Sequence, residues 1–330
     1  MPTLVLIGVG AGLVSAVLFA SASTGTVLGV LVLFFLSPLP VAIAGLGWGW
    51  MAAALAAVSG CLLVALLGTG RATLFYGLAL GLPTAAMSYL VLLNRPAPDV
   101  AGTPGGALEW YPIGHLLAWA ALWAGCLAAV GLLATASDVE SLRTALRSNF
   151  ERFLASGGAV PGSEGQGLDG NQLAVFVDLM VATFAGAIAT LWMGVATFNL
   201  WVAGQVTRIS KQLQRPWPDL SSIELPRRLP IVFAIAVAAT FLPDLLGLIA
   251  SGFASAMLFA YMLVGLAIVH QLTRGMASRP LVLAAVYASL LFLSPFSNLL
   301  LALAGIAEPF SPLRRQPASP GPPPGPFPNQ

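Results

Sequence analysis

Long apolar segments recur along the whole chain, separated by short polar connections. No side chain before Arg71 carries a formal charge. About twenty apolar residues suffice to cross a membrane, because its hydrocarbon core is about 30 Å thick and an α-helix rises about 1.5 Å per residue. The pattern predicts an all-α, polytopic transmembrane helix bundle of about eight to nine spans. We place the spans at residues 3–22, 26–45, 49–69, 73–93, 112–134, 172–205, 230–250, 252–270 and 281–306.

Prolines interrupt several of these apolar segments. A proline inside a helix removes a backbone hydrogen-bond donor and clashes with the preceding turn, so it kinks or breaks the helix. The interrupting prolines are Pro38, Pro40, Pro83, Pro243 and Pro295. Residues 35–38 and 292–295 also share the sequence Phe-Leu-Ser-Pro. Paired broken helices are typical of transporter binding sites, but a repeat this short also arises by chance in an apolar chain.

The longest connection, residues 135–171, contains one further helical pattern. Within 137–156 apolar residues recur at helical spacing, and charged residues occupy the remaining positions. Ser137 and Glu140 have the spacing of a capping box. We expect an interfacial amphipathic helix that lies at the membrane surface or covers the bundle, either as a passive lid or as a gate.

Two polar segments and one possible cleavage site bear on the limits of the membrane domain. A glycine-rich linker is expected at Gly157–Gly170, and a disordered Pro-rich tail at 309–330. The small residues at 20–22 resemble a signal-peptidase site, but no basic residue precedes them, so we interpret the first apolar segment as a retained span. Residues 1–308 are therefore expected to form a single polytopic membrane domain.

The distribution of basic residues predicts an orientation. Five Lys and Arg residues lie between Arg208 and Arg228. Short loops rich in these residues stay on the cytoplasmic side of a membrane. We expect this loop to be cytoplasmic and the amphipathic segment 137–156 to lie on the opposite side.

Composition excludes several classes of function. The chain is 58% hydrophobic and only 8% charged, with a mean hydropathy of +0.90. Its net charge of +2 comes from scattered residues, so nucleic acid is not an expected partner. Cys61 and Cys126 lie in apolar segments without metal-ligand spacing, and no nucleotide, hydrolase or metalloprotease motif occurs. We expect no catalytic residues, no metal site and no cofactor.

Ionisable and polar residues within the spans are the candidate ligand-binding residues. A carboxylate in hydrocarbon costs at least about 2.5 kcal/mol on insertion scales, so it normally faces a cavity or a partner. Asp178 and Asp244 are placed at similar depth on successive spans, with Trp192 and Asn199 further along the first of them. Each aspartate has an alternative role, as a residue at a helix start or as a partner for backbone freed by proline. His270 is interpreted as an interfacial residue or as a proton relay.

Several short motifs resemble those of a known family. They are Ser37-Pro38-Leu39-Pro40, Gly45-Leu46-Gly47-Trp48, Glu109-Trp110-Tyr111-Pro112, Leu242-Pro243-Asp244-Leu245-Leu246-Gly247 and Gly265-Leu266-Ala267-Ile268-Val269-His270. Over residues 5–305 the chain resembles the YybS-like predicted bacterial membrane proteins, a family of unknown function. That family is similar to the substrate-binding membrane subunits of energy-coupling-factor importers. The resemblance implies capture of a small molecule from outside the cell and partner membrane subunits that supply energy.

These observations predict a multi-pass protein of the bacterial inner membrane, in contact with membrane lipids. The favoured function is a small-molecule transporter, or a substrate-binding transporter subunit, without catalysis of its own. The alternative is a structural or regulatory scaffold of the cell envelope that acts through segment 137–156 and the basic loop. A membrane enzyme that uses Asp178, Asp244 and His270 is the third hypothesis. The candidate ligand-binding residues are Asp178, Asp244, Trp192, Asn199, His270, Pro38, Pro40 and Pro295.

Overall fold

The computed structural model describes residues 2–21, 27–96, 108–155 and 169–310. The expected glycine-rich linker and Pro-rich tail lie almost entirely outside these residues. The chain divides into two compact units. The first comprises Met1–Asp219 and Ile223–Ala260, and the second comprises Leu220–Ser222 and the chain from Tyr261 onward.

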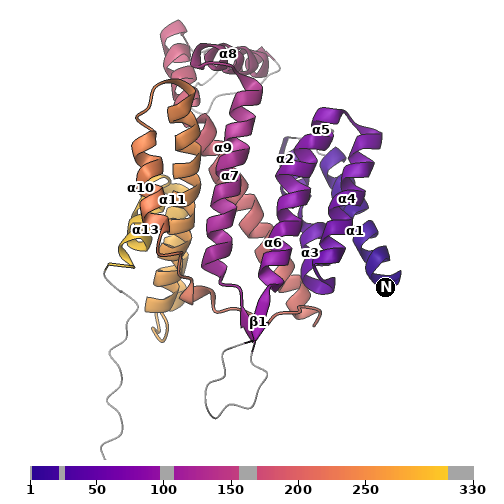
Figure 1. Ribbon diagram of the computed structural model, residues 1–330. Coiled ribbons are helices and arrows are strands. Elements are labelled where there is room, and N and C mark those ends of the chain that lie inside the picture. The colour runs from indigo at the N-terminus through magenta and orange to yellow at the C-terminus, as the bar shows by residue number, and fades with distance from the viewer. Residues whose placement is uncertain (1, 22–26, 97–107, 156–168, 311–330) are drawn as a thin grey trace, which may run out of the picture. The chain divides into compact units, whose positions relative to one another are not determined.

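Helices account for nearly all of the regular structure (Figure 1). In chain order they are α1 (Pro2–Ser21), α2 (Val27–Leu36), α3 (Leu39–Trp48), α4 (Trp50–Leu67), α5 (Gly70–Phe75), the π-helix η1 (Tyr76–Gly81), α6 (Leu82–Leu92), α7 (Ile113–Thr135), α8 (Val139–Ala155), α9 (Gly170–Ile209), the 3₁₀ turn η2 (Leu220–Ser222), α10 (Leu229–Ala239), α11 (Asp244–Leu272), α12 (Arg279–Phe292) and α13 (Phe296–Ala307). Strands β1 (Asn94–Pro96) and β2 (Leu108–Trp110) pair antiparallel between α6 and α7.

The prediction of an all-α polytopic bundle is confirmed. Among the described residues, 7 helices are long and apolar enough to cross a membrane, or up to 8 if the bent pair α12–α13 counts as one span. The expected breaks at Pro38, Pro243 and Pro295 are present, since they separate α2 from α3, α10 from α11, and α12 from α13. The last pair is bent by 119°.

The expected boundary between spans 230–250 and 252–270 is wrong. The chain breaks earlier, between Ala239 and Asp244, and α11 continues through Gly252 as one helix of 29 residues. Pro243 lacks an N–H group and Asp244 adopts a left-handed backbone with φ of 58°, so the helix cannot run through this point. Glycine is well tolerated inside a membrane helix, which explains why position 252 does not interrupt it.

Small residues allow the first helices to approach closely. Gly8 and Gly12, four residues apart, lie on the face of α1 that contacts α4. A Cβ atom at Gly12 would overlap the backbone oxygen of Ala56 and the hydroxyl of Ser59. The α1–α4 contact therefore gains its dispersion energy from backbone approach, as is common between helices in lipid.

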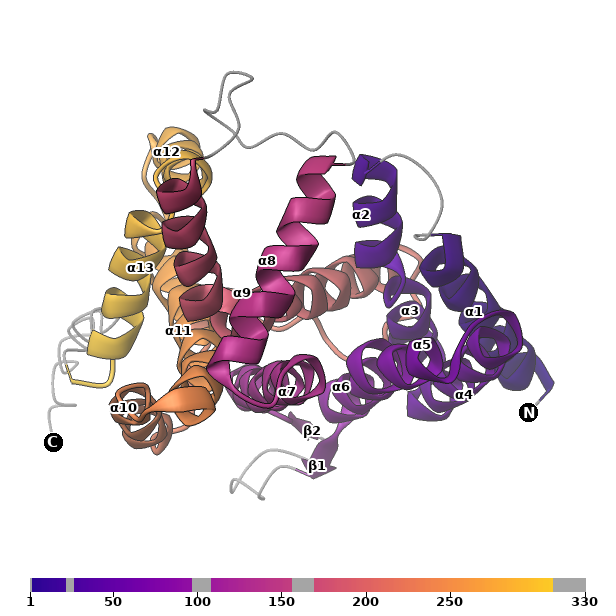
Figure 2. The ribbon, with the colours of Figure 1, turned by 90° about the horizontal axis from the view of Figure 1, so that it is seen from above.

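Helix α8 lies across one end of α7 and α9 (Figures 1 and 2). Its buried residues Leu142, Leu146 and Phe150 recur on one face, and the first two pack against apolar side chains of α7, α9 and the start of α11. The predicted amphipathic helix is therefore present and covers the bundle. Its N-terminal cap lies one residue later than expected. The Asp138 carboxylate accepts from the Ser141 N–H at 2.7 Å, and the Ser141 hydroxyl accepts from the Asp138 N–H at 3.1 Å.

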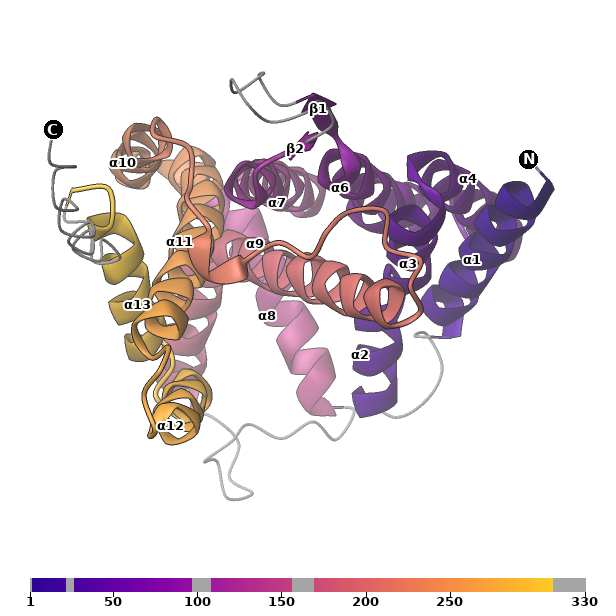
Figure 3. The same cartoon turned by 90° about the horizontal axis from the view of Figure 1, so that it is seen from below.

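The basic connection from Ser210 to Arg228 crosses the opposite end of α9. Seen from below, it leaves α9 beside α3 and returns across the bundle to α10 (Figure 3). Arg215 donates to the carbonyls of Val91 and Tyr111 at 3.1 and 3.0 Å, and its guanidinium lies 5.7 Å from the Trp110 ring. The connection is thereby joined to the ends of α6 and the segment preceding α7.

Candidate functional site

The α2–α3 break frees backbone carbonyls inside the first unit. Pro38 and Pro40 have no N–H, so the carbonyls of Phe34 and Leu36 lose the donors that an α-helix would supply four residues later. Ser37 partly replaces them, since its N–H and its hydroxyl both donate to the Phe34 oxygen, at 3.2 and 2.8 Å. Ser37 is fully buried. Irregular backbone at this depth is tolerated only where protein groups or an enclosed polar site satisfy it.

Three side chains from other elements complete the break. Ser15 of α1 donates its hydroxyl proton to the Ser37 oxygen at 2.5 Å, and the Tyr76 hydroxyl donates to the Ser15 oxygen at 2.7 Å. Asn199 of α9 donates to the Phe35 oxygen at 2.6 Å. We call Ser15, Ser37, Tyr76 and Asn199 the break cluster. Each of its members is at most 1% exposed.

A second irregular segment, η1, lies next to the break cluster and includes Tyr76. Pro83 provides no N–H for the carbonyl four residues back, Ala79, or for the one five residues back, Leu78. Both carbonyls accept from tryptophan side chains instead. Trp192 donates to Ala79 at 2.6 Å, and Trp123 of α7 donates to Leu78 at 3.1 Å. The expected break at Pro83 is therefore a π-helical segment within a continuous span.

One face of α9 serves both irregular segments. Trp192 and Asn199 are seven residues apart, which is close to two full turns and about 10 Å along the helix. Trp192 satisfies η1, while Asn199 satisfies the α2–α3 break. This face therefore joins Trp192 and Asn199, two of the expected site residues, to the segments that Pro83, Pro38 and Pro40 interrupt.

The break cluster contains no charge. No Asp, Glu, Lys, Arg or His precedes Arg71, and residues 179–207 of α9 contain none. The Asn199 side-chain nitrogen also donates to the Val195 oxygen at 2.8 Å, so both of its bonds fix the orientation of the amide. Its oxygen, Oδ1, is buried and has no hydrogen-bond partner among the residues that the structure describes.

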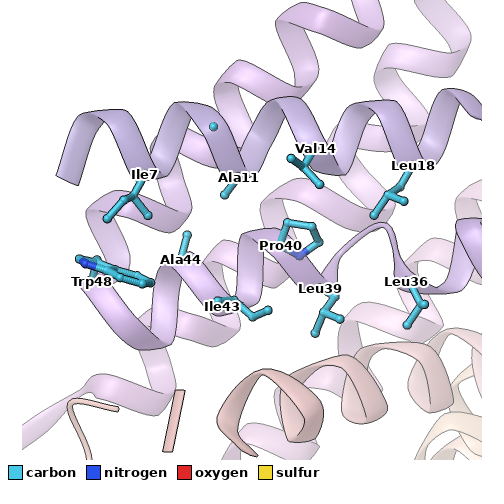
Figure 4. Close-up of a pocket in the computed structure, with 11 residues that line it drawn as sticks. Ile7, Ala11, Val14, Leu18, Leu36, Leu39, Pro40, Ile43, Ala44 and Trp48 are labelled. Atoms are coloured by element: carbon cyan, nitrogen blue, oxygen red, sulfur yellow. The ribbon is translucent and has the colours of Figure 1, made fainter. Parts of the chain in front are cut away.

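An apolar groove of about 330 Å³ flanks the break on its α1 side. Ala11, Val14 and Leu18 of α1 project toward Pro40 and Ala44 of α3, with Trp48 at the far end (Figure 4). The groove is open along its length and carries no charged side chain. Pro40, three residues after Ser37 of the break cluster, lines this groove.

Asp178 and Asp244 lie at the end of the bundle covered by α8. Their neighbours Val177 and Leu245 belong to the same apolar cluster. The Asp178 carboxylate accepts from the Arg143 Nε at 2.9 Å, and its side chain is 58% exposed. Asp244 is exposed at the first residue of α11. Neither residue lines the groove, and a cavity shared by the two stays a prediction.

The remaining expected residues belong to the second unit. His270, near the end of α11, hydrogen-bonds through Nε2 to the Tyr287 hydroxyl of α12 at 2.9 Å. Pro295 lies at the bend between α12 and α13. No group of three or more His, Cys, Asp or Glu side chains that could hold a metal ion occurs among the described residues.

Residues 13–308 match the family described as "Predicted membrane protein (DUF2232)". The chain belongs to this family. DUF2232 covers nearly all of both units, from α1 to the end of α13. The match identifies the chain as a membrane protein and confirms its resemblance to the YybS-like family. The apolar helices described above make it a multi-pass one. No curated protein and no solved structure matches the chain.

Four residues of this site in the DUF2232 chain were not among the expected site residues. Ser37 was noted only as part of the repeated Phe-Leu-Ser-Pro sequence and of a family motif. Ser15, Tyr76 and Trp123 are ordinary residues in apolar helices, and nothing in their spacing marks them. A signal was available for the tryptophan, because Pro83 leaves a carbonyl that requires a donor from another helix. Which helix supplies that donor depends on tertiary packing.

Proposed function

We propose that this protein is a small-molecule transporter, or the substrate-binding subunit of one, and that it works without catalysis of its own. The observation that carries the proposal is the pair of irregular segments that share the polar face of α9. Discontinuous helices whose backbone groups face the protein interior are the usual location of substrate and ion sites in secondary transporters.

Three further features support this proposal. The break cluster is uncharged and buried, which suits recognition of a dehydrated ligand through hydrogen bonds. One carbonyl oxygen in it, Asn199 Oδ1, has no partner among the described residues, and buried polar atoms are otherwise nearly always satisfied. The segments around the site are broken at prolines, and such breaks provide the hinge points that alternating access requires.

The proposed location is the inner membrane, with the basic connection Ser210–Arg228 on the cytoplasmic side. Similarity of the family to energy-coupling-factor subunits favours a partner complex that supplies energy. Asp178, Asp244 and His270 remain candidate residues for later steps of transport. Their positions outside the break cluster make them secondary to Asn199 in this proposal.

The scaffold hypothesis makes the opposite prediction about which surface matters. We would compare Asn199→Leu with Arg147→Gln, which removes an exposed charge of α8, in growth complementation of a deletion strain. The transporter proposal expects Asn199→Leu to lose complementation and Arg147→Gln to retain it, with both proteins present in the membrane at wild-type levels. Retained growth with Asn199→Leu and lost growth with Arg147→Gln would favour the scaffold.

A further inference from the structure

The break cluster has more hydrogen-bond acceptors than donors. Each hydroxyl proton is already committed, because Tyr76 donates to Ser15, Ser15 donates to the Ser37 carbonyl, and Ser37 donates to the Phe34 carbonyl. Both protons of the Asn199 amide are directed to carbonyls as well. Pro38 and Pro40 remove two N–H groups that would otherwise contribute. What remains at the cluster is a set of oxygen lone pairs.

Asn199 Oδ1 is one of these excess acceptors, because it is buried and has no hydrogen-bond donor among the described residues. Its side chain is 1% exposed, and its amide is held against the break by the bond to the Phe35 oxygen. Flipping the amide would place Oδ1 against two carbonyl oxygens, so the nitrogen must occupy its present position. The unpartnered atom is therefore an acceptor. Only a cation or a hydrogen-bond donor can satisfy it.

The chemistry of the cluster restricts that group. A divalent ion such as Ca²⁺ or Mg²⁺ normally requires carboxylates, and the break cluster has none. Neutral carbonyl, amide and hydroxyl oxygens are the ligands that bind dehydrated monovalent cations in membrane proteins. A large organic cation does not fit a cluster whose members are fully buried.

We propose that the break cluster binds one compact monovalent cation, an alkali ion or an ammonium group, with Asn199 Oδ1 as a ligand. This inference rests on the proposed function, because a transporter would use such a cation as its coupling ion or as its cargo. Binding adds a ligand between α9 and the α2–α3 break. Binding therefore stabilises the contact between α9 and the α2–α3 break.

Cation-dependent thermal stability tests the proposal. The full-length protein is purified in detergent with choline as the only cation, then melted in increasing NaCl, KCl or NH₄Cl, with choline chloride holding ionic strength constant. We expect at least one of the three ions to raise the unfolding midpoint in a saturable manner, because a ligand that binds only the folded state stabilises it. Comparison of the three salts distinguishes an alkali ion from ammonium. Equal midpoints in all salts would overturn the proposal and leave a buried water as the partner of Oδ1.

Two variants assign the response to Asn199. Asn199→Leu should lose the cation-dependent rise. Thr197→Val, two residues earlier on α9, should keep it, although it also removes a partly buried hydrogen-bond donor. A full response in Asn199→Leu would overturn the assignment. If Asn199→Leu fails to fold, Asn199→Ser replaces it, because a serine hydroxyl can bond to the carbonyl of Val195 one turn earlier but does not supply Oδ1. The same loss of response is expected.

The cation proposal and the transporter proposal fail in different ways. If no cation changes the unfolding midpoint but growth still requires Asn199, the cation proposal is wrong and the transporter proposal stands. A specific cation response in a chain that grows normally with Asn199→Leu supports the cation site and removes the support for transport.

Discussion

Trp192→Phe is the variant that most clearly tests how η1 is stabilised. The indole N–H donates to the Ala79 oxygen at 2.6 Å across 113 positions of sequence. Phenylalanine fills most of the same space but has no donor. Pro83, four residues later, cannot donate a hydrogen bond to the Ala79 carbonyl in its place, because proline has no N–H.

The expected cost follows from leaving one buried carbonyl without a partner. Such a group destabilises a folded protein by about 1–3 kcal/mol. With an unfolding entropy of about 2.1 cal/mol/K per residue, each kcal/mol lowers the unfolding midpoint of a chain of this size by about 1.5 °C, so the expected decrease is about 1.5–4.5 °C. Thermal unfolding in detergent, followed by the fluorescence of the remaining tryptophans, measures it.

Trp119→Phe is the matched control. Trp119 also donates through its indole, to the Tyr111 hydroxyl at 3.1 Å, but this bond is exposed and Tyr111 precedes α7. Its loss should cost less than about 1 kcal/mol, because an exposed hydroxyl near a helix end finds another partner. Equal midpoints for the two variants would refute the reasoning.

A double variant identifies the cause of the loss. Pro83→Ala restores an N–H at the position where Ala79 or Leu78 needs a donor, so it should reduce the cost of Trp192→Phe. The coupling between the two substitutions is measured by a double-mutant cycle. Strictly additive costs would show that the tryptophan stabilises the fold by packing alone.

Three other predictions follow from the helix contacts, the α8 cap and the topology. Gly265→Leu should lower the melting midpoint by several degrees because its Cβ would overlap backbone of α13, whereas Gly131→Leu should have little effect because open space surrounds that position. The Ser141 backbone N–H lowers the pKa of Asp138, so its capping contribution should be complete above the ordinary carboxyl pKa of about 3.9 and decrease as pH falls further. Hydrogen exchange at the start of α8, corrected for intrinsic rates, should show this loss of protection, and unchanged protection would contradict it. A reporter fused near Leu220 should be cytoplasmic and one near Gly165 should not. Both reporters on one side would contradict a single crossing by α9.

Local chemistry made much of this fold predictable from the sequence. Proline lacks an N–H in any environment, so the breaks at Pro38, Pro243 and Pro295 required no knowledge of neighbouring helices. The amphipathic pattern of α8 was equally local, because alternating apolar and charged residues have only one way to face a bundle. The cap position was displaced because both Ser137 and Asp138 are good N-cap residues.

Tertiary packing decided what the sequence did not predict. At Pro83 the same chemistry gives a π-helix instead of a break, because Trp123 and Trp192 supply donors at that point. The role of Asn199 depends on a contact with Phe35, 164 positions away. Asp178 was expected near a cavity, but its partner Arg143 lies on a helix whose docking the sequence did not specify. The sequence therefore indicated which polar residues have partners in the fold more reliably than it indicated which residues lie together.

Accessibility of the break cluster in native membranes tests the central claim most directly. Cys61 and Cys126 are first replaced by alanine, and Ser37→Cys is then exposed to a small hydrophilic thiol reagent, with Ser141→Cys as the labelled control and Ala185→Cys as the buried one. A site that opens during transport should label at Ser37→Cys at a rate between the two controls, and a bound monovalent cation should slow that labelling. A rate no greater than that of Ala185→Cys, in a protein that still folds and supports growth, would contradict the account and leave the break cluster as a structural feature.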